Sequence, residues 1–256
     1  MNKKIYIAVI CAFSLLLTVS TGFLIKHYYD SHKQAKIYDS LAEIVDKTPD
    51  GTSEVMNYSG DKTFIPEYQE LYLENNDMVG WLKIEDTKIN YPVMQSKDNS
   101  NFYLKHGFDK KYTNYGCPYV QENCDTEQPN DNIVIYGHNM NDGSMFSTLT
   151  KYKSKEFWES HKYITFDTLT DKQNYEVIAA FKTVVYTDNA DSFKYYQFVN
   201  AETAEEFNAY IGKCKELSLY DTGLNAEYGD KLITLSTCEY SRTNGRFVVV
   251  ARLVKE

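Results

Sequence analysis

The sequence contains little cysteine and no excess of positive charge. Five cysteines in 256 residues are far fewer than a disulfide scaffold needs, and no CxxC pair or Cys/His cluster has the spacing of a metal site. The formal net charge is −9, and no basic stripe runs along the chain. We therefore expect no metal, no cofactor and no nucleic-acid partner. Internal repeats and low-complexity tracts are also absent.

Residues 5–25 carry no charge and, as a helix, would span roughly 30 Å, the thickness of the hydrocarbon core of a bilayer. A cleaved signal peptide is the alternative, but its apolar core is usually about 7–15 residues long. We favour an uncleaved membrane anchor over residues 5–25, preceded by a short N-terminus over residues 1–4. Lysines stand on both sides of the run, so charge alone does not orient the anchor.

The rest of the chain predicts mainly β structure with peripheral helices. We expect a juxtamembrane helix and linker over residues 26–63, with a loose link from about residue 50, and a folded domain over residues 64–256. A T-x-x-E capping box at residues 203–206 begins an amphipathic helix that reaches about residue 219. Short helices are expected at 65–75 and within 144–161. The predicted strands are 80–84, 88–95, 119–123, 132–139, 163–168, 175–186, 232–238 and 247–254.

The cysteines beyond the apolar run have different surroundings in the sequence. Cys214 falls on the apolar stripe of the amphipathic helix, so we expect it in the core. Cys117 and Cys124 could bridge across a turn, although two free thiols fit the sequence better. Cys238 ends a strand, where regular alternation gives way to a polar segment. It is therefore the candidate for chemistry.

The turn after Cys238 decides which residue faces its thiol. Asn244-Gly245 is a strong signal for a two-residue hairpin, which would place Cys238 opposite Ala251. An open loop over residues 239–245 would place Cys238 opposite Arg246 instead. We favour the open loop because loops at strand ends are where chemistry is usually displayed. The alternative is a tight hairpin with a buried cysteine and a surface arginine.

His138 alone among the five histidines directly follows a strong apolar strand, between Gly137 and Asn139. A strand-end histidine by itself is more often structural than catalytic. A nucleophilic cysteine, however, needs a group that exchanges protons and a group that holds the developing oxyanion. His138, Cys238 and Arg246 together meet these needs and predict a cysteine-dependent active site.

These motifs resemble those of the sortases, the membrane-anchored cysteine transpeptidases of Gram-positive bacteria, and specifically class B. The matching segments are TLSTC at 234–238, Arg246 leading into FVVVARLV, YGHN at 136–139 with the following MFSTL, GWLKIEDTKINYPVMQ at 80–95 and FYLKHGF at 102–108. The resemblance covers roughly residues 66–254. The helix before the cysteine strand and the N-terminal helices suggest class B. The resemblance implies a closed, mixed eight-stranded β-barrel with peripheral helices, a cytoplasmic N-terminus and an extracellular catalytic domain on a single-pass anchor.

The resemblance also implies a role for each candidate residue. Cys238 would attack the carbonyl of a Thr in a short sorting motif near the C-terminus of a surface protein. His138 would protonate the leaving amine and later activate the incoming one. Arg246 would hold the substrate carbonyl and its oxyanion, with the backbone N–H of Glu239 as second donor. An amine of a peptidoglycan cross-bridge or stem peptide would then resolve the thioacyl intermediate.

Other points stay open in the sequence. We expect Leu104, Tyr186 and Ser236, with Glu239, to line the substrate groove, and we assign no acidic third member to the site. The ordinary pKa values of Cys and His favour a neutral thiol and a neutral imidazole, unless the environment shifts both. Two other functions compete with the transpeptidase: a thiol endopeptidase that releases its acyl group to water, and a non-catalytic membrane-tethered binding module.

Overall fold

The computed structural model describes residues 3–47, 56–128, 130–185 and 193–255. The chain divides into two compact units, Met1–Ser40 and Leu41–Glu256, which are described separately. The first unit is the larger part of one helix, α1 (Lys3–Lys47), which continues across the predicted boundary between anchor and juxtamembrane segment at residue 25. By length and composition α1 could cross a membrane, although a signal sequence would meet the same criteria.

The second unit begins with small elements. The predicted loose link over residues 50–63 is wrong in its second half, because β1 (Asn57–Ser59) and β2 (Lys62–Thr63) form a short antiparallel hairpin. The first half of that link, residues 48–55, lies outside the described ranges. The predicted helix at 65–75 is confirmed as α2 (Pro66–Glu74), which has a proline in its first turn, where the missing N–H is not needed.

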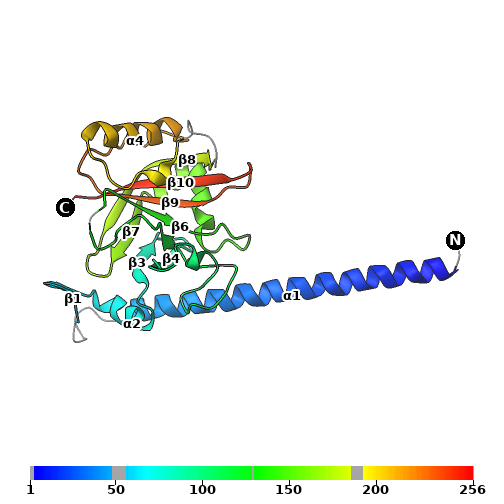
Figure 1. Ribbon diagram of the computed structural model, residues 1–256. Helices are drawn as coiled ribbons and strands as arrows, with labels where there is room; N and C mark the ends of the chain where they lie inside the picture. The colour runs from blue at the N-terminus through cyan, green and yellow to red at the C-terminus, as the bar shows by residue number, and fades with distance from the viewer. Residues whose placement is uncertain (1–2, 48–55, 129, 186–192, 256) are drawn as a thin grey trace. The chain divides into compact units, whose positions relative to one another are not determined.

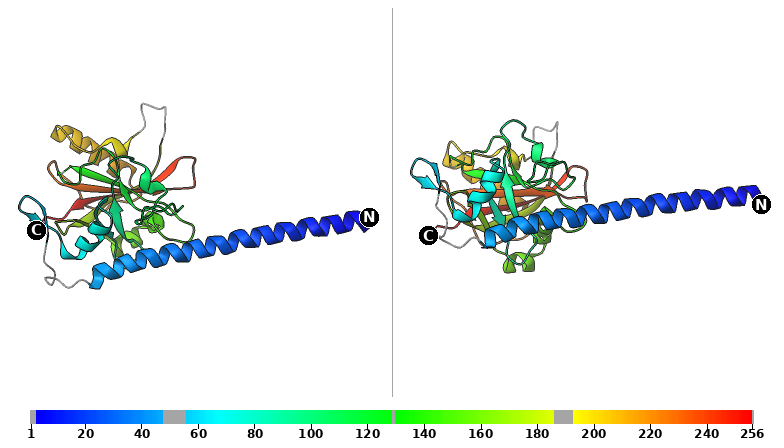
Figure 2. Two further views of the ribbon diagram at one scale, coloured as in Figure 1. Left: turned by 60° about the horizontal axis from the view of Figure 1, so that its bottom comes forward. Right: turned by 90° about the horizontal axis from the view of Figure 1, so that it is seen from below.

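The predicted closed, mixed eight-stranded barrel is confirmed (Figures 1 and 2), in the strand order β10-β8-β7-β3-β4-β5-β6-β9. Strands β9 and β10 pair with each other and complete the closure. The pairs β4–β5 and β6–β9 are parallel, and the other pairs are antiparallel. The strands are β3 (Met78–Lys83), β4 (Asn90–Met94), β5 (Tyr119–Val120), β6 (Asn132–Tyr136), β7 (Tyr163–Thr168), β8 (Asn174–Val184), β9 (Leu232–Cys238) and β10 (Gly245–Leu253).

The predicted amphipathic helix is confirmed as α4 (Ala204–Leu217), which lies along the outside of the barrel beside β8 and β10 (Figure 1). The Thr203 hydroxyl caps it by accepting a hydrogen bond from the Glu206 N–H at 3.3 Å. Its apolar stripe, which includes the fully buried Cys214, packs with Phe181 and Val248 of the sheet. Four short helices complete the unit: η1 (Phe102–Leu104), η2 (Phe146–Lys153), α3 (Lys155–Ser160) and η3 (Tyr195–Gln197).

Cys117 and Cys124 are both buried and free, so the two thiols are not bridged. The Cys117 thiol donates to the Pro92 carbonyl at 3.5 Å, and the Cys124 thiol donates to the Asn132 carbonyl at 3.7 Å. Burial raises the pKa of Cys124 to about 11. A buried thiol with a raised pKa is a poor nucleophile, so these two cysteines are structural.

Candidate active site

Strands β9 and β10 place Cys238 directly opposite Arg246, which confirms the open loop and excludes the two-residue hairpin. Ala251 pairs with Ile233 instead. The next position along has a hydrogen bond from the Glu239 N–H to the Gly245 carbonyl at 2.9 Å. Hydrogen-bonded and non-hydrogen-bonded pairs alternate in an antiparallel ladder, so Cys238 and Arg246 form a non-hydrogen-bonded pair, in which side chains approach most closely.

The loop over residues 239–244 is closed by Asn244 and Gly245 at its end. Asn244 has a φ of 55°, a left-handed conformation that asparagine tolerates better than most residues. A Cβ on Gly245 would lie 2.2 Å from the Glu239 carbonyl oxygen, so only glycine allows the two chains to approach this closely. The Asn-Gly pair therefore closes a longer loop and does not form the two-residue turn that it usually indicates.

The structure corrects the role expected of Glu239. Its N–H donates to the Gly245 carbonyl and is not free to hold an oxyanion. Its side chain is 7% exposed and forms ion pairs with Lys153 at 2.9 Å and Lys182 at 3.3 Å. Hydrogen bonds from the Ser241 hydroxyl and N–H, together with the two lysines, lower the pKa of Glu239 to about 2 despite its burial. Glu239 thus organises the loop and is not among the residues that line the pocket.

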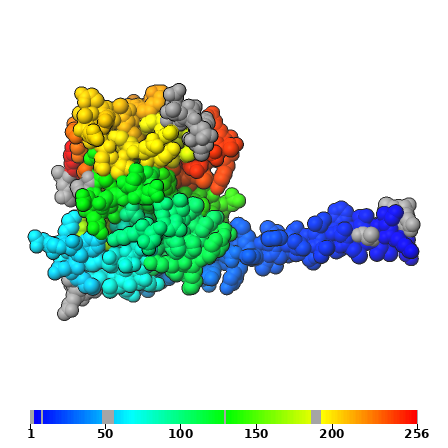
Figure 3. Space-filling model, in the orientation of Figure 1, coloured from blue at the N-terminus to red at the C-terminus, as the bar shows by residue number. Residues whose placement is uncertain are grey.

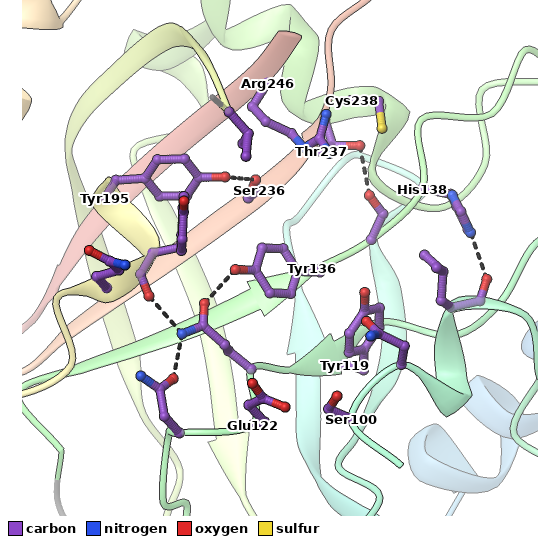
Figure 4. Close-up of a pocket in the computed structure, with 18 residues that line it drawn as sticks. Ser100, Tyr119, Glu122, Tyr136, His138, Tyr195, Ser236, Thr237, Cys238 and Arg246 are labelled. Carbon is purple, nitrogen blue, oxygen red and sulfur yellow. Dashed lines mark hydrogen bonds between the residues drawn. The ribbon is translucent and has the colours of Figure 1, made fainter. Parts of the chain in front are cut away.

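His138 reaches the same rim of the barrel because β6 runs parallel to β9, with Tyr136 beside Ser236. One residue further, the Gly137 N–H donates to the Ser236 carbonyl at 3.2 Å, and the Thr237 hydroxyl donates to the Gly137 carbonyl at 2.7 Å. The carboxyl ends of parallel neighbours emerge at one edge of a sheet. His138 and Cys238, which follow these pairs, therefore face the same pocket (Figure 4).

The backbone at His138 is fixed by its neighbours. A Cβ on Gly137 would lie 2.5 Å from the Phe146 ring, so glycine is the residue that fits before His138. The Phe146 N–H in turn donates to the His138 carbonyl at 2.8 Å. Phe146 is fully buried at the start of η2, so this contact ties the histidine to the core.

The imidazole of His138 has one defined partner, the Leu104 carbonyl, which lies 2.7 Å from Nε2 (Figure 4). A carbonyl only accepts, so Nε2 carries a hydrogen and Nδ1 is left to exchange a proton with a reacting group. Burial lowers the pKa of His138, the bond to Leu104 opposes this effect, and the positive charge of Lys105 adds to it. The neutral imidazole is therefore favoured at neutral pH.

Arg246 keeps most of its donors available. Its Nη1 donates to the neighbouring Gly245 carbonyl at 3.0 Å, and within the described ranges no carboxylate forms an ion pair with it. Two tyrosines in the same pocket, Tyr119 and Tyr195, have pKa values raised to about 12, chiefly by burial. They are neutral phenols. Arg246 is thus a half-buried cation that can receive a carbonyl or an oxyanion.

The pocket around these residues has a volume of about 590 Å³. Of the residues expected in the groove, Leu104 and Ser236 line it, Glu239 does not, and Tyr186 lies outside the described ranges. In the part of the chain that the structure describes, no group of three or more His, Cys, Asp or Glu side chains could hold a metal ion.

Several lining residues escaped the sequence reasoning, among them Tyr136, Tyr195 and Glu122. Tyr136 could have been found, because it lies two residues before His138 and so shares its face. Tyr195 comes from a distant segment, and its hydroxyl lies 2.7 Å from the Ser236 hydroxyl. That segment lies against residues 120–132 at the surface (Figure 3), where Gln121 Nε2 donates to the Tyr196 carbonyl at 2.6 Å. No local pattern announces such a contact.

The family model described as Sortase domain matches residues 82–254. The chain belongs to the sortase family, class B. Sortase B of Listeria monocytogenes is 37% identical over 73% of this chain and 74% of its own. Sortase B of Staphylococcus aureus is 29% identical over 100% of this chain and 99% of its own. Sortase B of Bacillus anthracis, solved in complex with AAEK1, has a TM-score of 0.75 at 31% identity, covering 90% of this sortase and 100% of that chain.

The sortase B relatives agree with the architecture of the pocket. This sortase is therefore a cysteine transpeptidase built on the closed barrel described above. Cys238 is the half-exposed thiol of the second unit, since Cys117, Cys124 and Cys214 are buried there.

Proposed function

We propose that this sortase cleaves a C-terminal sorting motif of surface proteins after Thr and transfers the protein to a peptidoglycan amine. Cys238 is the nucleophile, His138 the acid and base, and Arg246 the oxyanion partner. The observation that carries the proposal is the register of β9 and β10, which sets Cys238 directly opposite an arginine without a carboxylate partner among the described residues. The parallel β6 brings His138 to the same rim.

In the first step the Cys238 sulfur attacks the Thr carbonyl, and the thiol proton passes to His138 Nδ1. A C–S bond forms, and the carbonyl oxygen takes up negative charge that Arg246 stabilises. The scissile C–N bond then breaks as His138 returns the proton to the leaving amine. The product is a thioacyl enzyme and a free C-terminal fragment. Leu104 holds the opposite ring nitrogen throughout, which keeps Nδ1 facing the reaction.

In the second step an amine attacks the thioacyl carbonyl, gives its proton to His138, and displaces the Cys238 sulfur, which is reprotonated. A peptidoglycan cross-bridge or stem-peptide amine is the proposed acceptor. Two solved relatives support the two ligands: a Staphylococcus aureus sortase B–substrate complex at 29% identity, and a sortase B complexed with triglycine at 28% identity. The pocket, at about 590 Å³, has room for an extended peptide.

The proposed setting is the outer face of the cytoplasmic membrane. Residues 5–25 would anchor the chain, residues 1–4 would stay in the cytoplasm, and residues 26–63 would lead to an extracellular catalytic domain over residues 64–256. The apolar first half of α1 and the sortase membership support this arrangement.

Product analysis tests the proposed reaction. The full-length protein is incubated with a library of sorting-motif peptides, with and without triglycine as the acceptor amine. We expect a peptide–triglycine conjugate that forms only when the amine is present. Cleaved peptide in an unchanged mixture would favour the thiol endopeptidase, and intact peptide in both mixtures would favour the non-catalytic binding module.

The rate of the first step should depend on pH through His138. The neutral imidazole has to accept the thiol proton, and burial lowers the pKa of His138 below its ordinary value of 6.5. We therefore expect kcat/KM to be nearly constant just above pH 6.5 and to fall about tenfold per unit below an apparent pKa under 6.5. The measurement is a pH–rate profile with the best peptide of the library. An acidic limb centred above pH 7 would contradict the assignment.

A further inference from the structure

Asn139, the residue after His138, holds the chain on both sides of the nucleophile. Its side-chain Nδ2 donates to the Cys238 carbonyl at 2.8 Å. Its own carbonyl accepts a hydrogen bond from the Tyr240 hydroxyl at 2.9 Å. The two bonds connect the loop after β6 to the loop after β9, one residue beyond His138 and at or just after Cys238.

The local β structure explains why a side chain is needed here. The backbone hydrogen bonds between β6 and β9 reach Gly137 and Ser236. Beyond them Asn139 turns to bridge with Met145, while β9 continues along β10. In the non-hydrogen-bonded pair with Arg246, the Cys238 carbonyl points away from β10 and toward β6. Asn139 Nδ2 takes the position of the missing backbone donor.

We propose that Asn139 is a positioning residue, and that Asn139 and Tyr240 together form a latch that fixes the spacing between His138 and Cys238. The inference rests on the proposed function, in which a proton passes between these two side chains. Proton transfer requires heavy atoms within about 3 Å, and small displacements lower the rate steeply. The latch acts on the backbone of both residues and touches neither the substrate nor the reacting atoms.

Tyr240 contributes to the latch through its hydroxyl group. Its side chain is 70% exposed, so the ring buries little apolar surface. Removing the hydroxyl in Tyr240→Phe should therefore leave the stability of the barrel nearly unchanged. The same holds for Asn139, which is half-buried in a loop and contributes no side chain to the core. Losses of activity in these variants can then be separated from unfolding.

The test compares Asn139→Ala, Asn139→Asp and Tyr240→Phe in the full-length protein, with the best library peptide and triglycine. We expect Asn139→Ala and Asn139→Asp to lower kcat about 10- to 100-fold, with KM within about twofold and an unchanged melting temperature. Asp keeps the shape of Asn but cannot donate when ionised. Tyr240→Phe should lower kcat about three- to tenfold, and the double variant should lose less than the product of the two effects.

Asn208→Ala, on the exposed face of α4, and Tyr228→Phe are the matched controls, and both should keep full activity. Wild-type kcat in both Asn139 variants would overturn the latch, as would a loss confined to KM or a fall in melting temperature that accounts for the lost activity. If Cys238→Ala abolishes transfer while the Asn139 variants are fully active, the latch alone fails. If Cys238→Ala stays active, the proposed function fails.

Discussion

Replacing Cys238 by alanine should abolish transfer, with a loss of at least about 10⁴-fold in the rate of peptide–triglycine formation. The thioacyl intermediate cannot form without the sulfur, and no other described cysteine lies in the pocket. The side chain is half-buried at a strand end, so the fold should not depend on it. The measurement is the rate of conjugate formation by the purified full-length variant, together with its melting temperature.

Cys11→Ala provides the control for this prediction, because Cys11 is an exposed cysteine of α1 far along the sequence from the pocket. It should transfer peptide at the wild-type rate. Transfer by Cys238→Ala above about one hundredth of the wild-type rate would mean that another group forms the intermediate.

Replacing Arg246 by alanine should lower kcat by about 10²- to 10³-fold, the usual cost of removing one oxyanion donor. The guanidinium forms no ion pair with a described carboxylate, so its loss leaves no buried charge without a partner. The melting temperature should therefore change little. Arg246→Lys keeps the charge but loses the planar donor fork, and we expect it to recover only part of the rate. The measurement is steady-state kinetics with the peptide and triglycine.

Arg242 offers a matched control, because it is exposed on the same loop and lines no part of the pocket. Arg242→Ala should leave kcat and KM within about twofold of the wild-type values. An Arg246→Ala variant that raises KM while keeping kcat would assign the guanidinium to substrate binding in place of oxyanion stabilisation.

Local patterns in the sequence predicted most of the barrel. Alternating apolar residues marked all eight strands, and the capping box at Thr203 marked α4. The family resemblance supplied the closure of the barrel, which no single segment encodes. The hairpin at residues 57–63 was missed because each strand is only two or three residues long and carries no apolar alternation. A short polar hairpin and a loose link look alike in one sequence.

The site was predictable where one residue follows directly from a strand end. Cys238 and Arg246 were placed opposite each other by choosing an open loop over the Asn-Gly signal, and the register agrees. Glu239 was misjudged because its N–H lies next to Cys238 in sequence, whereas the tight approach of Gly245 takes up that donor. Tyr195 was missed because its contact with Ser236 joins segments about 40 residues apart.

The mass of the acylated enzyme tests the central claim most directly. The full-length protein is mixed with the best library peptide without an acceptor amine, quenched in acid, digested and analysed by mass spectrometry. We expect the N-terminal peptide fragment, ending in Thr, to be attached to Cys238, and to leave on addition of triglycine. Cleaved peptide with an unmodified Cys238 at every time point, or a fragment attached to a different residue, would contradict the account.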